Sequence, residues 1–279
     1  MPDRPLLIAL IAGVLQGIFE WLPISSEGNI TLFLTAVGAG PEAALQFALF
    51  LHVGTAISAA AYYRDEVGDV LRAPFDLING RTSGGLFSGE TADFSFVLVA
   101  TLASGVTGIV VYLTLDAVVT ELAGGAFVAL IGVLLVGTGV LLKTADRFDL
   151  ATRETPDLVD AVLVGSLQGI ALLPGVSRSG TTASALLFRG HDGPSAFRLS
   201  FLLSIPAAAG AGVLVFLDTG IPSVSPTAAA VAIFASATVG YLTIDALMRL
   251  VERVAFWGVC IGLGTLAIVG GGVLVVTGA

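Results

Sequence analysis

The sequence is poor in charged residues. Only 12% of its 279 residues are Asp, Glu, Lys or Arg, whereas 56% are hydrophobic, and the mean hydropathy is +0.97. Soluble domains carry about 25% charged residues, so this chain lacks the polar side chains needed to cover a globular surface. The shortage excludes an ordinary soluble enzyme and a disordered protein, and it indicates a polytopic integral membrane protein.

Cysteine and lysine are almost missing as well. Cys260 is the one cysteine, which excludes an internal disulfide and a metal site built on cysteines. Lys143 is the one lysine, and 21 acidic residues against 12 basic ones give a net charge of −9. We therefore expect no nucleic-acid partner, because an acidic chain is not attracted to a phosphate backbone. The acidic, lysine-poor composition also favours an organism that lives in high salt.

Long apolar segments are abundant, and they predict an all-α fold. Six of them reach the roughly 20 residues that a helix needs to cross the hydrocarbon core. These predicted transmembrane helices are 44–63, 94–118, 122–142, 196–217, 226–248 and 255–277. Four shorter segments form two pairs, 5–19 with 22–37 and 159–173 with 181–188. A break rich in Pro, Gly and Ser interrupts each pair, which predicts two re-entrant helical hairpins.

The two breaks resemble each other, which predicts an internal duplication. A shift of 152 residues aligns them without gaps. Under this shift Gly13, Leu15, Gln16, Gly17, Ile18, Ser25 and Gly28 fall on Gly165, Leu167, Gln168, Gly169, Ile170, Ser177 and Gly180. Each copy holds one hairpin and three spans, an odd number, so the second copy must be inverted. We expect a single membrane domain, 1–279, with inverted repeat halves at about 1–143 and 153–279.

The basic residues predict the orientation of this repeat. Ten of the twelve fall on one predicted face, in segments 64–92, 143–158, 189–198 and 249–253. The exceptions are Arg4 and Arg178. Because Lys and Arg concentrate in cytoplasmic loops, we expect both termini outside and a cytosolic loop at about 64–92.

The first break carries groups that are costly inside a membrane and are usually functional there. Gln16 and Glu20 are four residues apart, so on a helix they share a face and can present oxygen ligands to Mg²⁺ or Ca²⁺. A structural hydrogen-bonded pair is the alternative. Glu27 is either a helix-start residue favoured by the helix dipole or a catalytic group. Ser25 and Ser26 either act in the site or satisfy the broken backbone.

The second break suits a phosphate. Ser177, Arg178, Ser179 and Thr182 lie where a Gly-rich turn leads into a helix, whose N–H groups attract anions. The arginine can grip two oxygens, or it can serve as a counter-ion for Glu20. A carboxylate with a metal that faces such a cradle predicts phosphoryl-group chemistry.

One histidine lies in the middle of a predicted span. His52 either packs within the span or faces the same cavity as the two breaks. We include it among the candidate substrate-binding residues.

These motifs resemble a known family. Residues 16–28 read QGIFEWLPISSEG and resemble the first signature of the undecaprenyl-diphosphate phosphatase (bacitracin-resistance) family. Residues 174–180 read PGVSRSG and are similar to its second signature. Segments 51–55 and 201–206 also look like family segments, so the resemblance covers essentially the whole chain. It implies a hydrolase that removes a phosphate from a polyprenyl diphosphate, which recycles the lipid carrier with the help of a divalent metal.

The resemblance also implies roles for individual residues. By position, Gln16 and Glu20 belong to the metal site, Ser26 is the nucleophile or its helper, and Arg178 binds phosphate. The remaining substrate-binding positions are Ser25, Asn29, His52, Ser177, Ser179 and Thr182.

Asn29 departs from the family pattern, which commonly has histidine there, and asparagine cannot act as a general base. Either Ser26 attacks, activated by Glu20, Glu27 or a metal, or a water held by the metal attacks. Glu27 replaces a small residue of the pattern and can supply the missing base or another metal ligand.

The sequence therefore predicts a multi-pass protein of the cell membrane, from an archaeal and halophilic source. The expected substrate is an undecaprenyl- or dolichyl-type diphosphate, and the site is expected to open to the extracytoplasmic side. A homodimer is also expected. The alternative is a polyprenyl-phosphate transporter or flippase, because inverted repeats with re-entrant hairpins are typical of transporters.

Overall fold

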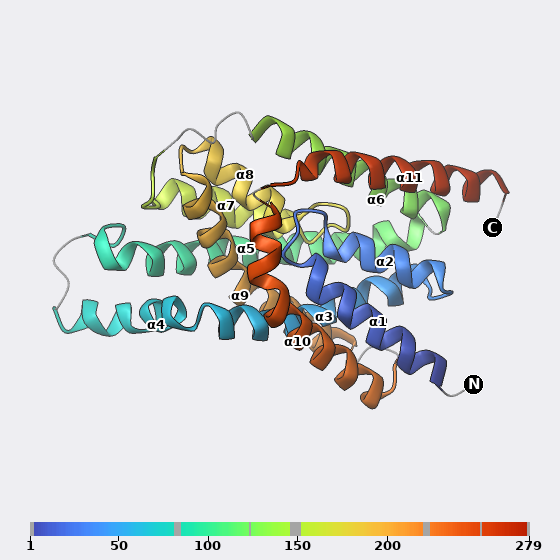
Figure 1. Cartoon of the computed structure of the whole chain (residues 1–279), viewed down its shortest axis with the longest axis horizontal. Coiled ribbons are helices and arrows are strands. Elements are labelled where there is room, and N and C mark those ends of the chain that lie inside the picture. Colours follow the sequence, from blue (N-terminus) through green and yellow to red (C-terminus); the bar gives the residue numbers. More distant parts are fainter. Residues whose placement is uncertain are drawn as a thin grey trace.

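The fold is a bundle of α-helices (Figure 1). A computed structural model describes residues 3–80, 85–122, 124–145, 152–219, 224–251 and 253–277, and these residues contain no β-strand beyond one isolated bridge. The helices are α1 (Asp3–Phe19), α2 (Ser26–Ala36), α3 (Pro41–Tyr62), α4 (Arg64–Ile78), α5 (Ala92–Glu121), α6 (Gly125–Ala145), α7 (Leu158–Ile170), α8 (Arg178–Phe188), α9 (Gly193–Thr219), α10 (Pro226–Val251) and α11 (Phe256–Thr277). A short 3₁₀ turn, Gly89–Thr91, precedes α5.

Six of the described helices are long and apolar enough to cross a membrane. They are α3, α5, α6, α9, α10 and α11. Many of their large apolar side chains are exposed, as expected of helices that face lipid rather than water. The predicted all-α, polytopic fold with six membrane helices is confirmed.

The four short helices form two pairs, α1 with α2 and α7 with α8. Helices α2 and α8 have 11 residues each, so each is roughly 16 Å long, about half of the hydrocarbon core. Neither can cross a bilayer alone. Their placement as re-entrant hairpins within a membrane stays a prediction.

The duplication is visible in the packing of the two hairpins. A Cβ added to Gly13 of α1 would lie 2.3 Å from the carbonyl oxygen of Ala232 in α10. A Cβ added to Gly165 of α7 would lie 2.3 Å from the carbonyl oxygen of Ala100 in α5. Each hairpin thus packs against a helix of the other half, so the halves interlock. Equivalent residues are 152 positions apart in the two hairpins (Gly13 and Gly165) and 132 positions apart in α5 and α10 (Ala100 and Ala232).

Helices α6 and α11 form a closely packed antiparallel pair (Figure 1). Gly125, at the start of α6, meets Gly271 near the end of α11, and Gly132 meets Gly264 halfway along. Since Gly132 and Gly264 are also 132 residues apart, the two helices are counterparts that run in opposite directions. An inverted duplication has this property.

The two described ends of the chain lie on the same side of the molecule (Figure 1), and the predicted orientation in the membrane stays a prediction. The start of α1 and the end of α11 lie at one end of the molecule, and α4, from the loop 64–92, lies at the other (Figure 1). Two basic residues used for the sequence prediction, Arg81 and Arg147, lie outside the described residues.

Candidate active site

The two breaks touch each other. The Ser25 hydroxyl accepts hydrogen bonds from the Gly28 N–H at 3.3 Å and from the Gly175 N–H of the second break at 3.0 Å. Ser25 has φ 60°, and among the described non-glycine residues it alone has a positive φ. Gly175 has φ +103°, and a Cβ there would lie 2.5 Å from the carbonyl oxygen of Ile131. Backbone in such sparsely populated conformations concentrates at functional sites.

Each break leads into the N-terminus of a helix. Ser25 caps α2, and Ser177 caps α8 by accepting a hydrogen bond from the Gly180 N–H at 3.2 Å. The two serines therefore do satisfy backbone groups, as one interpretation of the sequence proposed. The caps also bring together two helix N-termini, whose N–H groups attract anions.

Glu20 lies between the two breaks and is only 4% exposed. One carboxylate oxygen accepts hydrogen bonds from the Gln16 amide at 2.9 Å and from the Ser26 hydroxyl at 2.8 Å. The other carboxylate oxygen forms an ion pair with Arg178. A buried carboxylate is stable only with such partners, so Arg178 is the counter-ion of Glu20 in this arrangement.

His52 of α3 joins the same cluster. Its Nε2 lies 3.3 Å from Glu20 and 3.0 Å from Glu27, and its Nδ1 lies 3.0 Å from the Ala48 carbonyl oxygen. Because that carbonyl can only accept, Nδ1 carries a proton, and Nε2 faces two carboxylates. Both carboxylates therefore lie within ion-pair distance of Nε2. The cluster of Glu20, Ser26, Glu27, His52 and Arg178, here called the charged cluster, can exchange a proton within itself.

The other predicted site residues lie around this cluster. The Ser179 hydroxyl is 3.5 Å from both the Ser177 hydroxyl and the Leu22 carbonyl oxygen. Thr182 donates to the Arg178 carbonyl at 2.8 Å and contacts the Ser200 hydroxyl at 2.6 Å. Thr182 thus holds the first turn of α8, and its role as a phosphate ligand stays a prediction.

Asn29 has a local structural contact. Its side-chain amide donates to the carbonyl oxygens of Ile24 at 2.6 Å and Ser25 at 2.9 Å. These bonds fasten the first break. The expectation that Asn29 binds phosphate stays a prediction.

The charged cluster encloses almost no free space. The space enclosed by Glu20, Ser26, Glu27, Arg178 and the neighbouring serines is about 10 Å³, close to the volume of one water-sized probe. A phosphate does not fit there until these side chains move. Arg178 Nη1 is buried and has no hydrogen-bond partner among the described residues, so one face of the guanidinium is available to an anion.

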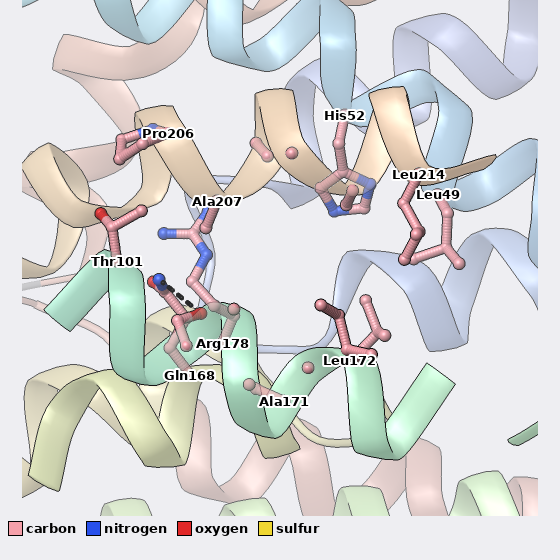
Figure 2. Close-up of a pocket in the computed structure, with 18 of the residues that line it drawn as sticks. Leu49, His52, Thr101, Gln168, Ala171, Leu172, Arg178, Pro206, Ala207 and Leu214 are labelled. Atoms are coloured by element: carbon pink, nitrogen blue, oxygen red, sulfur yellow. Dashed lines mark hydrogen bonds between the residues drawn. The ribbon is translucent and has the colours of Figure 1, made fainter. Parts of the chain in front are cut away.

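A second, larger cavity of about 290 Å³ adjoins the cluster. Glu27, His52 and Arg178 line it, so the charged cluster is accessible from this side (Figure 2). Gln168 and Thr101 also line it, and neither was among the predicted site residues. The repeat did carry a signal for Gln168, because it is the counterpart of Gln16.

The fit of a divalent cation to Gln16 and Glu20 is partial. Among the described residues, no group of three or more His, Cys, Asp or Glu side chains is arranged to hold a metal ion. The Glu20 carboxylate is occupied by Arg178 and its hydrogen-bond donors. Gln16 Oε1, however, is buried without a hydrogen-bond partner among the described residues, and an amide oxygen suits a hard cation.

The fold and the site together define a polytopic membrane protein with a buried cluster of acidic, basic and hydroxyl groups at the junction of two broken helix pairs. The chain belongs to the bacitracin resistance protein BacA family, whose model matches residues 9–268.

Its relatives match it over nearly their full length. An undecaprenyl-diphosphatase of Haloarcula marismortui is 56% identical over 96% of this chain and 98% of the relative. An undecaprenyl-diphosphatase of Methanococcoides burtonii is 37% identical over 93% of this chain and 96% of the relative. One of Geobacter sulfurreducens is 38% identical over 89% and 91%. The Haloarcula relative supports the expectation of a halophilic, archaeal source.

Proposed function

We propose that the protein is an integral-membrane phosphatase that hydrolyses a polyprenyl diphosphate to the monophosphate and inorganic phosphate. The main support is the charged cluster, which places a hydroxyl, two carboxylates, a histidine and an arginine in contact at the facing ends of α2 and α8. The similarity to proteins named undecaprenyl-diphosphatase supports the same substrate class.

Ser26 is the proposed nucleophile. Its hydroxyl already donates to Glu20, so the proton can pass to that carboxylate as the oxygen attacks the terminal phosphorus. The bond to the bridging oxygen breaks, and the lipid monophosphate leaves with the electron pair. Water then attacks the phosphoserine, both of its protons leave with the phosphate as H₂PO₄⁻, and Glu20 returns its proton to the Ser26 oxygen.

Arg178 holds the terminal phosphate in this proposal. Its Nη1 has no hydrogen-bond partner among the described residues, its side chain lines the larger cavity, and its positive charge offsets the charge that the phosphate brings. His52 Nε2 lies 3.0 Å from Glu27 in the same cluster, and a proton held between them would stabilise the leaving monophosphate. This assigns to His52 a function that Asn29 cannot perform.

Direct attack by water is the alternative route. A Ser26→Ala variant distinguishes the two, because it removes the nucleophile but leaves Glu20, Arg178 and His52 in place. We expect it to lose nearly all phosphate release. Substantial activity in this variant, with no phosphoserine trapped in the wild type by acid quenching, would assign the attack to water.

A divalent cation, Mg²⁺ or Ca²⁺, is part of the proposal. Gln16 Oε1 and Glu20 would hold it once a phosphate has replaced the carboxylate on Arg178, and it would screen the charge of the phosphates. Removal of the metal with EDTA is expected to abolish phosphate release, and Mg²⁺ or Ca²⁺ is expected to restore it. Full activity in EDTA would remove the cation from the mechanism.

We place the protein in the cell membrane, with two re-entrant hairpins, both termini outside and the site open to the extracytoplasmic side. The distribution of basic residues supports this orientation. Accessibility of cysteines introduced at the loop 64–92 and at the start of α1 tests it in sealed vesicles. The proposal also includes a homodimer. Light scattering of the purified protein in detergent tests this oligomeric state.

The decisive experiment is phosphate release by the purified protein from undecaprenyl and dolichyl-type diphosphates. We expect release in the presence of Mg²⁺ or Ca²⁺. No release with either metal, together with movement of polyprenyl phosphate across liposome membranes, would overturn the phosphatase and favour the transporter.

A further inference from the structure

The larger cavity lies between α5 and α9, with α3 and α7 behind it (Figure 2). Arg178, Thr101 and Gln168 lie toward one side of it, whereas Leu49, Leu172 and Leu214 lie toward the other, together with His52. A space lined by both polar and apolar side chains suits an amphiphile.

The polar side is not satisfied by the protein alone. Gln168 is 4% exposed, and its Oε1 has no hydrogen-bond partner among the described residues. Thr101 Oγ1 and Arg178 Nη1 are likewise buried and have no hydrogen-bond partner among the described residues. Buried polar atoms are rarely left unpaired in proteins, so three of them around one cavity indicate a polar ligand.

The cavity lies between α5 of the first half and α9 of the second, and their repeat counterparts, α10 and α3, pack together more closely. At that equivalent interface the Ser236 hydroxyl donates to the Leu51 carbonyl at 3.2 Å. The counterparts of these two residues are Ser104 and Leu203. They are instead bridged by the Gln168 amide, at 3.4 Å to each.

A proline accounts for part of this difference. Gly54 of α3 lets α10 approach so closely that an added Cβ would lie 2.7 Å from the Ile233 carbonyl oxygen. The counterpart of Gly54 on α9 is Pro206, which lines the cavity. Its ring adds bulk where the other half has none, and it removes a backbone donor from α9.

Small residues line the mouth of the cavity, although helix packing does not require a small residue at these positions. Gly105 of α5 and Gly210 of α9 are exposed, and an added Cβ at either would meet no described atom within 4 Å. Gly13 and Gly165, in contrast, are needed for helix contact. The two mouth glycines therefore leave room between the helices.

We propose that this cavity binds the first isoprene units of the lipid substrate. In this arrangement Gln168 and Thr101 face the phosphate that stays on the lipid, and Arg178 holds the one that leaves. A volume of about 290 Å³ is at the lower limit for small-molecule pockets, roughly 300–1,000 Å³, so most of a long polyprenyl chain must pass between α5 and α9 into the bilayer. This inference rests on the proposed function.

A second apolar groove, elsewhere on the molecule, is a poorer candidate. It lies between α3 and α10, is lined by residues such as Ile57, Phe234 and Leu242, and has no charged residue in its lining. A diphosphate headgroup bound there would find no cation.

The mouth glycines provide the first test. Gly105→Leu and Gly210→Leu are expected to narrow the entrance without disturbing packing. We expect each to lower kcat/KM for undecaprenyl diphosphate roughly 10-fold to 100-fold, mainly through KM. Gly270→Leu is the matched control, because Gly270 of α11 is also exposed with open space around it. Elution volume and melting temperature in detergent show whether each variant is folded.

Cross-linking provides the second test, and it does not need turnover. A farnesyl diphosphate analogue with a benzophenone on its prenyl chain is irradiated with the wild type, and the labelled peptides are identified. We expect labels on α5 and α9 that unmodified farnesyl diphosphate prevents. Labels on α10 in place of α5 and α9 would overturn the inference, as would label on α5 and α9 that the competitor does not reduce.

The two tests separate this inference from the proposed function. A wild type that releases no phosphate from any polyprenyl diphosphate overturns the proposed function. An active wild type whose Gly105→Leu and Gly210→Leu variants match Gly270→Leu overturns only the cavity assignment.

Discussion

The two hairpins have the same backbone arrangement, but the first carries acidic residues at its break and the second a basic one. Helices α2 and α8 are the same length, begin at equivalent positions and are both capped by serine. Ser26 of the first hairpin corresponds to Arg178 of the second, and Glu20 corresponds to Leu172. The duplication thus provides two facing helix N-termini, and divergence has placed the acids on one and the cation on the other.

The two equivalent interfaces between the halves also differ. Helix α10 contacts α3 directly through the Ser236–Leu51 hydrogen bond, whereas Gln168 bridges α5 and α9 beside a cavity of about 290 Å³. The side chains that face this cavity include members of the charged cluster from both hairpins. The site therefore lies where the two copies have ceased to be equivalent.

The largest expected effect comes from removing the charge that distinguishes the second hairpin. Arg178→Ala is expected to lower kcat/KM for a polyprenyl diphosphate about 10²-fold to 10³-fold, because the phosphate loses its cation and Glu20 its partner. Arg178→Lys keeps the charge but not the two-pronged geometry, so we expect only partial recovery. Arg249→Ala, at an exposed ion pair, is the control. Activity of Arg178→Ala equal to the control would mean that the two hairpins do not differ in function.

Much of this difference could be predicted from the sequence. The shift of 152 residues identified both breaks, Glu20, Glu27 and Arg178 stood out because charge is scarce inside the membrane, and the family resemblance implied Ser26. These positions depend on local motifs, and local motifs are readable in a single sequence.

The remaining features depend on contacts across the fold. His52 is one histidine in a long apolar span, and its place beside Glu20 and Glu27 depends on the packing of α3 against the first hairpin. The pairing of each hairpin with a helix of the other half leaves no local pattern. The cavity lined by Gln168 was not predicted for the same reason.

The next effect tests whether the acids of the first hairpin act as a pair. Glu27→Gln keeps the shape of the side chain but removes the charge that lies 3.0 Å from His52. We expect about a 10²-fold loss of phosphate release, near the lower end of general acid–base contributions. Glu42→Gln, at an exposed position in the first turn of α3, is the control. Full activity of Glu27→Gln would leave Glu27 as a helix-start residue only.

A smaller effect tests the close helix packing that the two hairpins share. Gly13→Ala and Gly165→Ala each place a methyl group 2.3 Å from a backbone carbonyl oxygen of the opposite half. Both are expected to destabilise the protein by about 1–3 kcal/mol, since backbone cannot move aside cheaply. Melting temperatures in detergent should fall by similar amounts, and Gly105→Ala should leave the melting temperature unchanged. A fall in only one of the pair would show that the halves do not pack alike.

A cluster near the start of α7 has no counterpart among the described residues of α1. Asp157 and Asp160 cap the helix reciprocally, and Arg153 and Arg189 form ion pairs with both acids. The counterpart of Asp160 in α1 is Ile8, so α1 lacks this anchor. We infer that the second hairpin is held in place at its entry by charge, and the first by packing alone.

The smallest expected effect is the pH dependence of this anchor. Burial acts to raise the pKa of Asp157, but the hydrogen bond from the Asp160 N–H and the contact with Arg153 lower it below its ordinary value of 3.8. A lowered carboxyl pKa stabilises the fold above the ordinary value, and this contribution is lost as the pH falls further. The melting temperature should therefore be flat from about pH 7 to pH 5 and fall below about pH 4. Asp157→Asn should show a smaller fall, because it has no charge to lose at this position. An equal fall in both proteins would assign the acid sensitivity to other carboxylates and remove Asp157 from the anchor.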